Sequence, residues 1–80
     1  SVSLHAQDAA QFVKEGIALH DQGEYAQAIE KYNEALKLNP TYWNAYYEIA
    51  YSYSALKEYE KTIASADLAI KYCEEKDRLY

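Results

Sequence analysis

Residues that could ligate a metal or attack a substrate are few in this 80-residue chain, and they lie far apart in the sequence. The histidines His5 and His20 and the single cysteine, Cys73, are the side chains most suited to binding a transition metal. No pair of them has the i, i+4 or C-x₂-C spacing that such sites require. We therefore expect neither a metal nor a cofactor.

Motifs for catalysis are also missing from the sequence. It contains no G-x-S-x-G, no glycine-rich phosphate loop and no His–Cys arrangement that would activate a nucleophile. His20, beside Asp21 at the expected end of a helix, is better explained as a partner of the helix dipole than as a general base. Cys73 fits a small apolar filler or a surface thiol, and Glu74 and Glu75 fit a solvated acidic turn. We predict that the chain is not an enzyme; the alternative is that chemistry resides elsewhere in a longer protein.

The charge balance excludes two classes of partner. Eight basic and thirteen acidic residues give a net charge of −5, without a cluster of Lys or Arg. Nucleic acid and anionic membrane surfaces would be repelled, so we expect neither as a partner. No apolar run approaches the roughly 20 residues of a membrane helix, which predicts a soluble protein. The ten tyrosines carry most of the aromatic content, and we expect many of these rings to be half-buried.

The N-terminal segment, residues 1–8, has two explanations. Its sequence SVSLHAQD is similar to the end of a secretory h-region with a cleavage site after Ala6, which would make the protein exported or periplasmic. The alternative is an ordinary helix start in a cytoplasmic protein. A lone cysteine permits no internal disulfide and does not decide between the compartments.

An internal repeat organises the rest of the chain. Sliding the sequence by 34 residues without a gap brings like residues into register. The matched pairs are Phe12 with Tyr46, Tyr25 with Tyr59, Ile29 with Ile63, Ala35 with Ala69 and Leu36 with Ile70. Self-similarity at this period indicates a solenoid of stacked units.

Each unit has the periodicity of a helix pair. In the first unit, Phe12, Gly16 and Leu19 share one helical face, and the break around Gly23 fits a left-handed helix end. A second helix is expected from about Tyr25 to Asn39-Pro40, because proline cannot continue the hydrogen-bond ladder. Thr41 is then the expected N-cap of the next helix.

These residues resemble the tetratricopeptide repeat, whose pattern is W-x₂-L-G-x₂-Y, A-x₃-F and P. The first unit supplies Phe12, Gly16, Leu19, Ala28, Tyr32 and Pro40, and the second supplies Tyr46, Ile49, Ala50 and Tyr53. The second unit departs from the pattern at Thr62, Ala66 and Glu74. The resemblance implies an all-α fold of four helices, stacked as antiparallel helix–turn–helix pairs in a short right-handed solenoid. The repeats would be residues 9–42 and 43–76, with 77–80 either starting a third repeat or extending the last helix.

The resemblance also implies a binding surface, because the first helix of each repeat in this family lines a concave groove for a peptide or a partner helix. By position, the groove residues are Val13, Ile17, His20, Asn44, Tyr47, Glu48 and Tyr51. The Lys/Asn/Arg carboxylate clamp of one subtype is missing, since its slots hold Val13, Ile17 and Glu48. We therefore expect an apolar or mildly basic protein segment as the ligand. The alternative is that Tyr47 and Tyr51 pack on neighbouring helices or lie under the N-terminal segment.

A second alternative for function is self-assembly. The last helix should expose an apolar face that includes Ile63 and Ile70, because no third repeat follows to cover it. A homodimer through this helix would bury that face. We therefore predict either a protein-interaction module with a free groove or a structural element whose apolar surfaces mediate oligomerisation or packing onto other domains.

Overall fold

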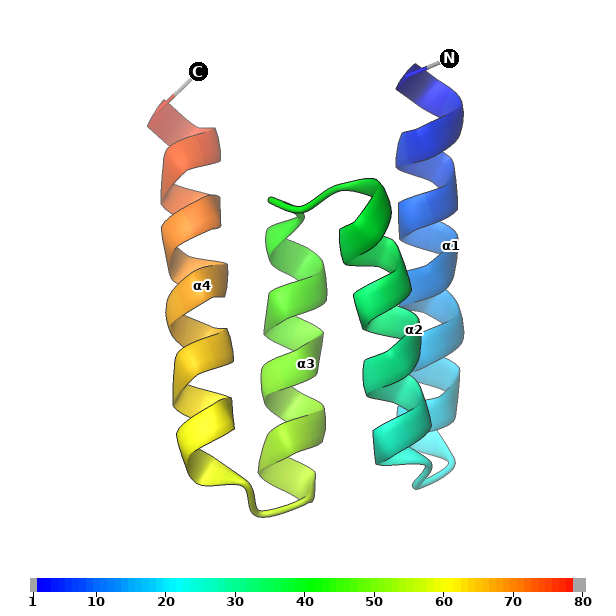
Figure 1. The fold of residues 1–80 in the computed structure, drawn as a ribbon, viewed down its shortest axis with the longest axis vertical. Coiled ribbons are helices and arrows are strands. Elements are labelled where there is room, and N and C mark those ends of the chain that lie inside the picture. Colours follow the sequence, from blue (N-terminus) through cyan, green and yellow to red (C-terminus); the bar gives the residue numbers. More distant parts are fainter. Residues whose placement is uncertain (1, 79–80) are drawn as a thin grey trace.

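The structure is a computed structural model that describes residues 2–78, with side chains described for residues 8–77. In that part of the chain it consists of helices joined by short connections (Figure 1). The helices are α1 (Val2–Asp21), α2 (Tyr25–Leu38), α3 (Trp43–Ala55) and α4 (Tyr59–Arg78). The predicted all-α class with four helices is confirmed.

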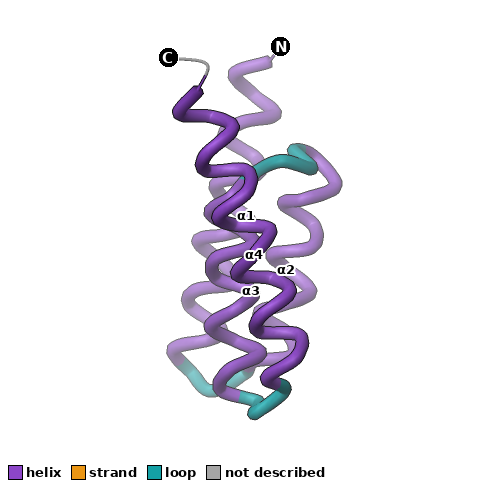
Figure 2. Tube along the Cα trace, turned by 90° about the vertical axis from the view of Figure 1, so that its left-hand side faces the viewer, coloured by secondary structure: helices purple, strands orange, loops and turns teal. Residues whose placement is uncertain are grey.

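The helices form two antiparallel pairs that stack side by side. α1 packs mainly against α2 and α3 against α4, while α3 also rests on α2 and, to a smaller extent, on α1. Figures 1 and 2 show the α1–α2 and α3–α4 turns at one end of the molecule and the α2–α3 connection at the other. This arrangement is a short solenoid of helix pairs, as the repeat predicts. None of the described helices is long and apolar enough to cross a membrane.

The two helix-pair turns have the same backbone geometry. In the first, the N–H of Gly23 donates to the carbonyl of His20 (2.9 Å) and that of Glu24 to Leu19 (2.9 Å). The second turn repeats both bonds at the positions 34 residues later, with lengths of 3.0 Å. Gly23 has φ +83° and its counterpart, Lys57, has φ +63°. This pattern is the Schellman motif, in which a left-handed residue ends the helix. The predicted left-handed Gly23 is therefore confirmed.

The connection between α2 and α3 differs from the prediction in one respect. α2 ends at Leu38, and Asn39 is extended, as expected for the residue before Pro40. Thr41, however, is not the N-cap of α3, because that position belongs to Tyr42 and carries no side-chain cap bond. Both the N–H and the hydroxyl of Thr41 instead donate to the Asn39 side-chain oxygen at 3.3 Å. Thr41 therefore belongs to a local Asx turn with Asn39, and its hydroxyl is not bonded to the first turn of α3 as a cap would be.

Both ends of the described chain lie in helices. α1 begins at Val2 and runs without a break through the segment that we set apart as residues 1–8. At the other end, α4 continues through Asp77 to Arg78. Leu79 and Tyr80 lie outside the described residues.

The core lies where the first three helices meet. Its buried residues are Ala9 and Val13 of α1, Ala28, Tyr32 and Ala35 of α2, and Ala45 and Ile49 of α3. Tyr32 is the largest of them, and Gly16 makes room for it, because a Cβ at Gly16 would overlap the Tyr32 ring. The Tyr32 hydroxyl is buried and makes no hydrogen bond of normal geometry among the described residues, although the Ser52 side chain lies near enough to lower its pKa slightly. Burial, with a smaller contribution from the charge of Glu48, raises the pKa of Tyr32 to about 12.

Candidate functional site

Three of the residues expected in the groove are large, apolar and exposed, one of them on α1 and two on α3. Ile17, Tyr47 and Tyr51 expose 36%, 47% and 53% of their area. We call these three residues the tyrosine face. Val13 was expected to extend it but is only 8% exposed and belongs to the core cluster with Ala45 and Ile49. The prediction of Val13 as an exposed groove residue is therefore wrong, because α3 packs closely enough over α1 to bury it.

The tyrosines of this face hold each other in place. The Tyr47 hydroxyl donates to the Tyr51 hydroxyl at 3.4 Å, and the two rings meet edge to face with centroids 5.2 Å apart. Trp43 continues the row, with its ring 6.3 Å from that of Tyr47. The hydrogen bond to Tyr51 is the main cause of a raised pKa of Tyr47. The Tyr47 hydroxyl therefore stays protonated at neutral pH.

His20 lies beside the tyrosine face and fixes α1 against the other helices. Its Nδ1 is 2.9 Å from the Ser52 Oγ, and its ring meets Tyr25 of α2 edge to face at 4.8 Å. A second edge contact, at 6.5 Å, joins it to Tyr51. Ser52 is fully buried on α3 and was not predicted from the sequence. Its spacing of three residues from Ile49, on the inward side of α3, was the available signal for it.

The two remaining predicted residues are placed differently from each other. Glu48 is half-buried close to His20, and burial is the main cause of its raised pKa, which the charge of His20 partly opposes. Asn44 instead lines a separate hollow at the α2–α3 connection, together with Thr41, Tyr42 and Tyr72. The structure therefore brings Glu48 toward the tyrosine face and does not bring Asn44 to it.

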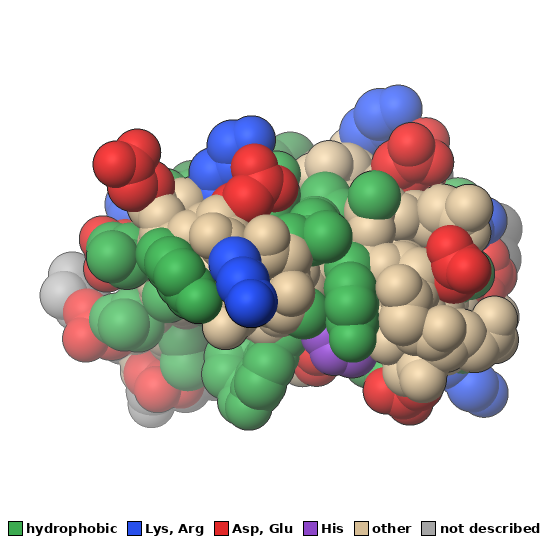
Figure 3. Space-filling model, turned by 90° about the horizontal axis from the view of Figure 1, so that it is seen from below, with side chains coloured by type: hydrophobic (Ala, Val, Ile, Leu, Met, Phe, Trp, Pro, Cys, Tyr) green, Lys and Arg blue, Asp and Glu red, His purple; other side chains and the backbone are tan. Residues whose placement is uncertain are grey.

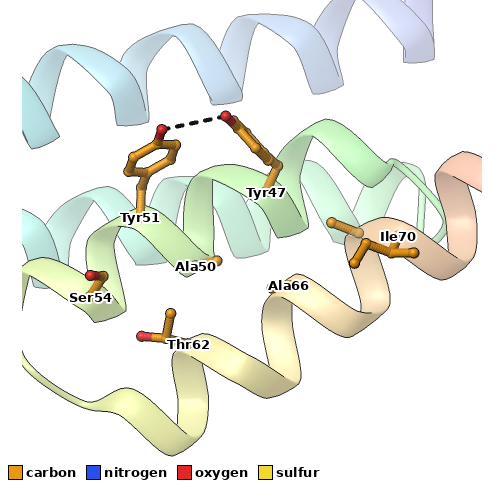
Figure 4. A pocket seen from close by; sticks show the side chains of 8 residues that line it. Tyr47, Ala50, Tyr51, Ser54, Thr62, Ala66 and Ile70 are labelled. Carbon is orange, nitrogen blue, oxygen red and sulfur yellow. Dashed lines mark hydrogen bonds between the residues drawn. The ribbon is translucent and has the colours of Figure 1, made fainter.

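A cavity of about 350 Å³ opens next to the tyrosines, between α3 and α4. It is lined by Tyr47, Ala50, Tyr51 and Ser54 from α3 and by Thr62, Ala66, Ala69 and Ile70 from α4. Figure 4 shows the side chains of Thr62 and Ile70 projecting from α4 toward α3. The α4 side of this cavity was not predicted as a site. Its signal was the departure of Ala66 from the family pattern, since a small residue in place of the aromatic ring leaves space unfilled.

The apolar surface is distributed unevenly over the molecule. Viewed from the end with the helix-pair turns, hydrophobic side chains gather toward α3 and α4, whereas the α1–α2 side is mostly polar and charged (Figure 3). The large exposed hydrophobic residues of α4 are Tyr59, Ile63, Leu68 and Ile70. Tyr59, Ile63 and Ile70 share one side of α4 by their spacing, and exposed apolar surface of this kind marks interaction sites in soluble proteins.

The described residues with possible metal or redox chemistry lie apart, and the side chain of His5 lies outside the described part of the chain. Among the described side chains, no three His, Cys, Asp or Glu residues are grouped as a metal site would need. Cys73 is a half-buried free cysteine on α4, and His20 is engaged with Ser52 on the other side of α3.

Family models match most of the described chain. Residues 16–57 match a model described as a TPR repeat, and this match alone spans more than half of the chain. Residues 44–76 match a second model, described as a tetratricopeptide repeat. Among curated proteins, no relative matches the chain.

Proposed function

Because the chain belongs to the tetratricopeptide repeat family, whose repeats generally mediate protein–protein interactions, we propose that it is a non-catalytic scaffold that binds a protein segment at the tyrosine face. The segment is a peptide or a partner helix that buries its apolar side chains on Ile17, Tyr47 and Tyr51. His20 and Glu48 border the face and contribute its polar contacts.

The exposure of a restrained tyrosine pair is the observation that carries this proposal. Aromatic side chains give much contact area for little loss of conformational entropy, which is why they dominate binding surfaces. Here the bond between the Tyr47 and Tyr51 hydroxyls and the edge-to-face contact of the rings reduce that loss further. A ligand would therefore meet a surface that is largely organised before binding.

The charges around the face define the preferred ligand. Glu48 and Asp21 lie near it, and the protein carries a net charge of −5. A carboxylate would be repelled there, while a Lys or Arg in the ligand would be attracted. We therefore propose an apolar segment with few or mildly basic charges, bound mainly through burial of apolar area.

Binding can be tested with a short synthetic peptide of Phe, Leu and Lys residues interrupted by proline, so that it stays extended. In an NMR titration, we expect the largest shifts at Ile17, Tyr47 and Tyr51. The variants Tyr47→Ser and Tyr51→Ser should each bind at least roughly tenfold more weakly. Tyr59→Ser, which alters an exposed tyrosine at the start of α4, is the matched control and should bind normally. Shifts confined to residues outside the tyrosine face would refute the proposal.

Self-assembly through α4 is the second candidate function, and the exposure of Ile63 and Ile70 favours it. A homodimer would bury these residues against their copies. Sedimentation at increasing protein concentration distinguishes the two functions: a monomer that binds the peptide supports the scaffold, and a dimer that Ile63→Asp dissociates supports self-assembly.

A further inference from the structure

The residues that line the cavity between α3 and α4 have counterparts in the first helix pair of the same chain. Each residue that lines it lies 34 positions after a residue of the α1–α2 pair. In order, the counterparts are Val13, Gly16, Ile17, His20, Ala28, Tyr32, Ala35 and Leu36. α3 packs on this surface of the first pair, so the cavity lies at the position where a next helix would sit on the second pair.

Two of the equivalent positions on the outer surface of the helix pairs differ sharply in burial. Val13 is 8% exposed and its counterpart Tyr47 is 47% exposed. Likewise, Ile29 is 8% exposed and Ile63 is 62% exposed. The residues are apolar in both pairs, so the difference comes from the presence or absence of a covering helix. No helix of the described chain covers the second pair.

We propose that the groove between α3 and α4 is a second binding surface, which takes an amphipathic helix of a partner protein seated as α3 is seated on α1 and α2. The partner helix carries at least one large apolar side chain on its buried face and Lys or Arg residues along one edge. This surface goes beyond the tyrosine face, although Tyr47 and Tyr51 border both.

The partner helix needs a large apolar side chain because the space between the helices is filled in the first pair and open in the second. In the first pair the Tyr32 ring occupies the groove, and α3 presents only Ala45, Ile49 and Ser52 as buried residues. In the second pair the counterpart of Tyr32 is Ala66, and the space of about 350 Å³ stays open. A helix with small residues like those of α3 would leave a void, whereas a Leu, Phe or Tyr would fill it.

The basic edge follows from the charges of α4. Tyr59, Ile63, Ala66, Ile70 and Cys73 form a stripe with alternating spacings of four and three residues, as in a coiled-coil seam. Glu60, Asp67 and Glu74 follow each other at seven-residue intervals, which places them in one row along the edge of this stripe. All three acids are exposed.

No salt bridge found within residues 8–77 includes an acid of that row. The ion pairs found there are Lys31–Glu15, Lys37–Glu34 and Lys61–Glu58, none of which includes Glu60, Asp67 or Glu74. The Lys71 ammonium, on the same helix, lies over the Tyr72 ring instead, 5.2 Å from its centroid. A partner helix with Lys or Arg on the matching edge would supply the missing positive charge.

The same row argues against a second copy of this chain as the occupant. In an antiparallel pair of α4 helices, residues of the same heptad edge face each other, so the two rows of acids would be opposed. Like charges in that position destabilise the pair and weaken a homodimer relative to a complex with a basic helix. A homodimer is therefore the competing outcome of the test.

The test uses the whole 80-residue chain and two stapled helical peptides of 13 residues, the length of α3. Both carry a Leu and Phe stripe; one has Lys and the other Glu along one edge. We expect the Lys peptide to bind at least roughly tenfold more tightly, from three exposed charge pairs, and the preference to shrink as salt is added. NMR shifts should centre on Ala66 and Ile70. Equal binding of the two peptides would overturn the proposal.

Two variants of α4 locate the binding surface. Replacing the row (Glu60→Lys, Asp67→Lys, Glu74→Lys) should reverse the preference, so that the Glu peptide binds more tightly. The charge-matched control changes three exposed acids of the first pair (Asp8→Lys, Glu24→Lys, Glu30→Lys) and should leave the preference for Lys in place. The proposal is overturned if the two triple variants behave alike.

A filled groove provides the second test. Ala66→Tyr should weaken the Lys peptide roughly tenfold or more, because a Cβ at Ala50 prevents the ring from packing down as Tyr32 does on Gly16. Circular dichroism shows whether this variant stays folded. If it does not, the triple charge-reversal variant of α4 tests the proposal instead. A dimer in sedimentation that excludes the peptide would overturn the proposal in favour of a second copy.

The two proposed surfaces can fail separately. Ile17→Ser alters the tyrosine face only, and Ala66→Tyr alters the α3–α4 groove only. Loss of extended-peptide binding in the first variant with normal binding of the Lys helix supports both surfaces as distinct sites. If Ile17→Ser and Ala66→Tyr each weaken the Lys helix equally, the groove is not a separate site and this inference is wrong.

Discussion

The two helix pairs follow one sequence pattern but reach different degrees of burial. In the first pair, Val13, Ala28, Tyr32 and Ala35 are buried, with α3 lying over them. In the second pair, Tyr47 is exposed at the position of Val13, and Ile63 is exposed at the position of the buried Ile29. Ala69 and its counterpart Ala35 are both buried. The comparison teaches that the repeat register fixes where a residue points, while the next helix in the stack decides whether that residue is core or surface.

The two helix pairs also differ in the sizes of the side chains that face each other between their helices. The first combines Gly16 with the large Tyr32, and the second combines Ala50 with Ala66 at the equivalent positions. An aromatic ring does not fit where the facing residue has a Cβ. The residue at the position of Gly16 therefore limits the size of the residue at the position of Tyr32. The consequence is a filled interface in the first pair and an open cavity in the second.

The largest difference between the pairs should come from removing Tyr32. We expect Tyr32→Ala to lower the free energy of unfolding by about 3–5 kcal/mol, as for other buried aromatic residues. Tyr47→Ala, at a half-exposed position of the second pair, should cost about 1 kcal/mol or less. Urea denaturation followed by circular dichroism measures both. Similar losses would show that the second pair is as tightly covered as the first.

Equivalent isoleucines provide the next comparison. Ile29→Ala should destabilise the protein by about 2–5 kcal/mol, because the side chain is buried. Ile63→Ala, 34 positions later, should change stability by no more than about 0.5 kcal/mol, since that side chain is mostly exposed. Thermal melts of the two variants at the same protein concentration test this. A large loss for Ile63→Ala would indicate that a second copy covers α4.

Gly16 tests whether the first pair is filled. An alanine in place of a helical glycine usually stabilises a helix by about 1 kcal/mol. Here we expect Gly16→Ala to destabilise by about 1–3 kcal/mol, because the new Cβ meets the Tyr32 ring. In a Tyr32→Ala background the same change should be stabilising. Denaturation of the four proteins of this cycle gives the coupling energy, and additive effects would contradict the predicted contact.

The Tyr32 hydroxyl predicts a pH dependence. Its pKa is raised from 10.0 to about 12 in the folded protein, so its contribution to stability is fully present below pH 10 and is lost as the pH rises through 12. Tyr32→Phe should weaken this alkaline loss and raise stability at pH 7 by about 1 kcal/mol, because an unpaired buried hydroxyl is removed. Urea unfolding curves of the two proteins at pH 7 and above pH 10 measure both effects. A Tyr32→Phe protein that is less stable at pH 7 would reveal a missing hydrogen bond.

The smallest expected effect concerns the two turns. Lys57 has the left-handed backbone that suits glycine, as Gly23 does in the first turn. Lys57→Gly should therefore stabilise the protein by about 1 kcal/mol, and Gly23→Lys should destabilise it by a similar amount. Opposite shifts of the melting temperature would confirm that the turns are equivalent. A loss on Lys57→Gly would assign the Lys57 side chain a stabilising contact.

The sequence predicted the features that depend on local rules. Gly23 ended a helix in the left-handed conformation, and Pro40 stopped the second helix before Asn39, because backbone sterics act within a few residues. Thr41 was predicted wrongly as an N-cap, since two local arrangements compete for its hydroxyl and its sequence position does not rank them. Of the expected groove residues, Ile17, Tyr47 and Tyr51 are exposed, whereas Val13 is part of the core.

By itself, the sequence determined the helical class, the 34-residue register and the positions where helices end, because periodicity and backbone preference are written in neighbouring residues. Only the tertiary structure decided which apolar positions are covered. Val13 and Tyr47 occupy the same place in the repeat, and the approach of α3 separates them into core and surface. The physical reason is that burial is a property of contacts between distant helices, and an open groove exists where such a contact is missing.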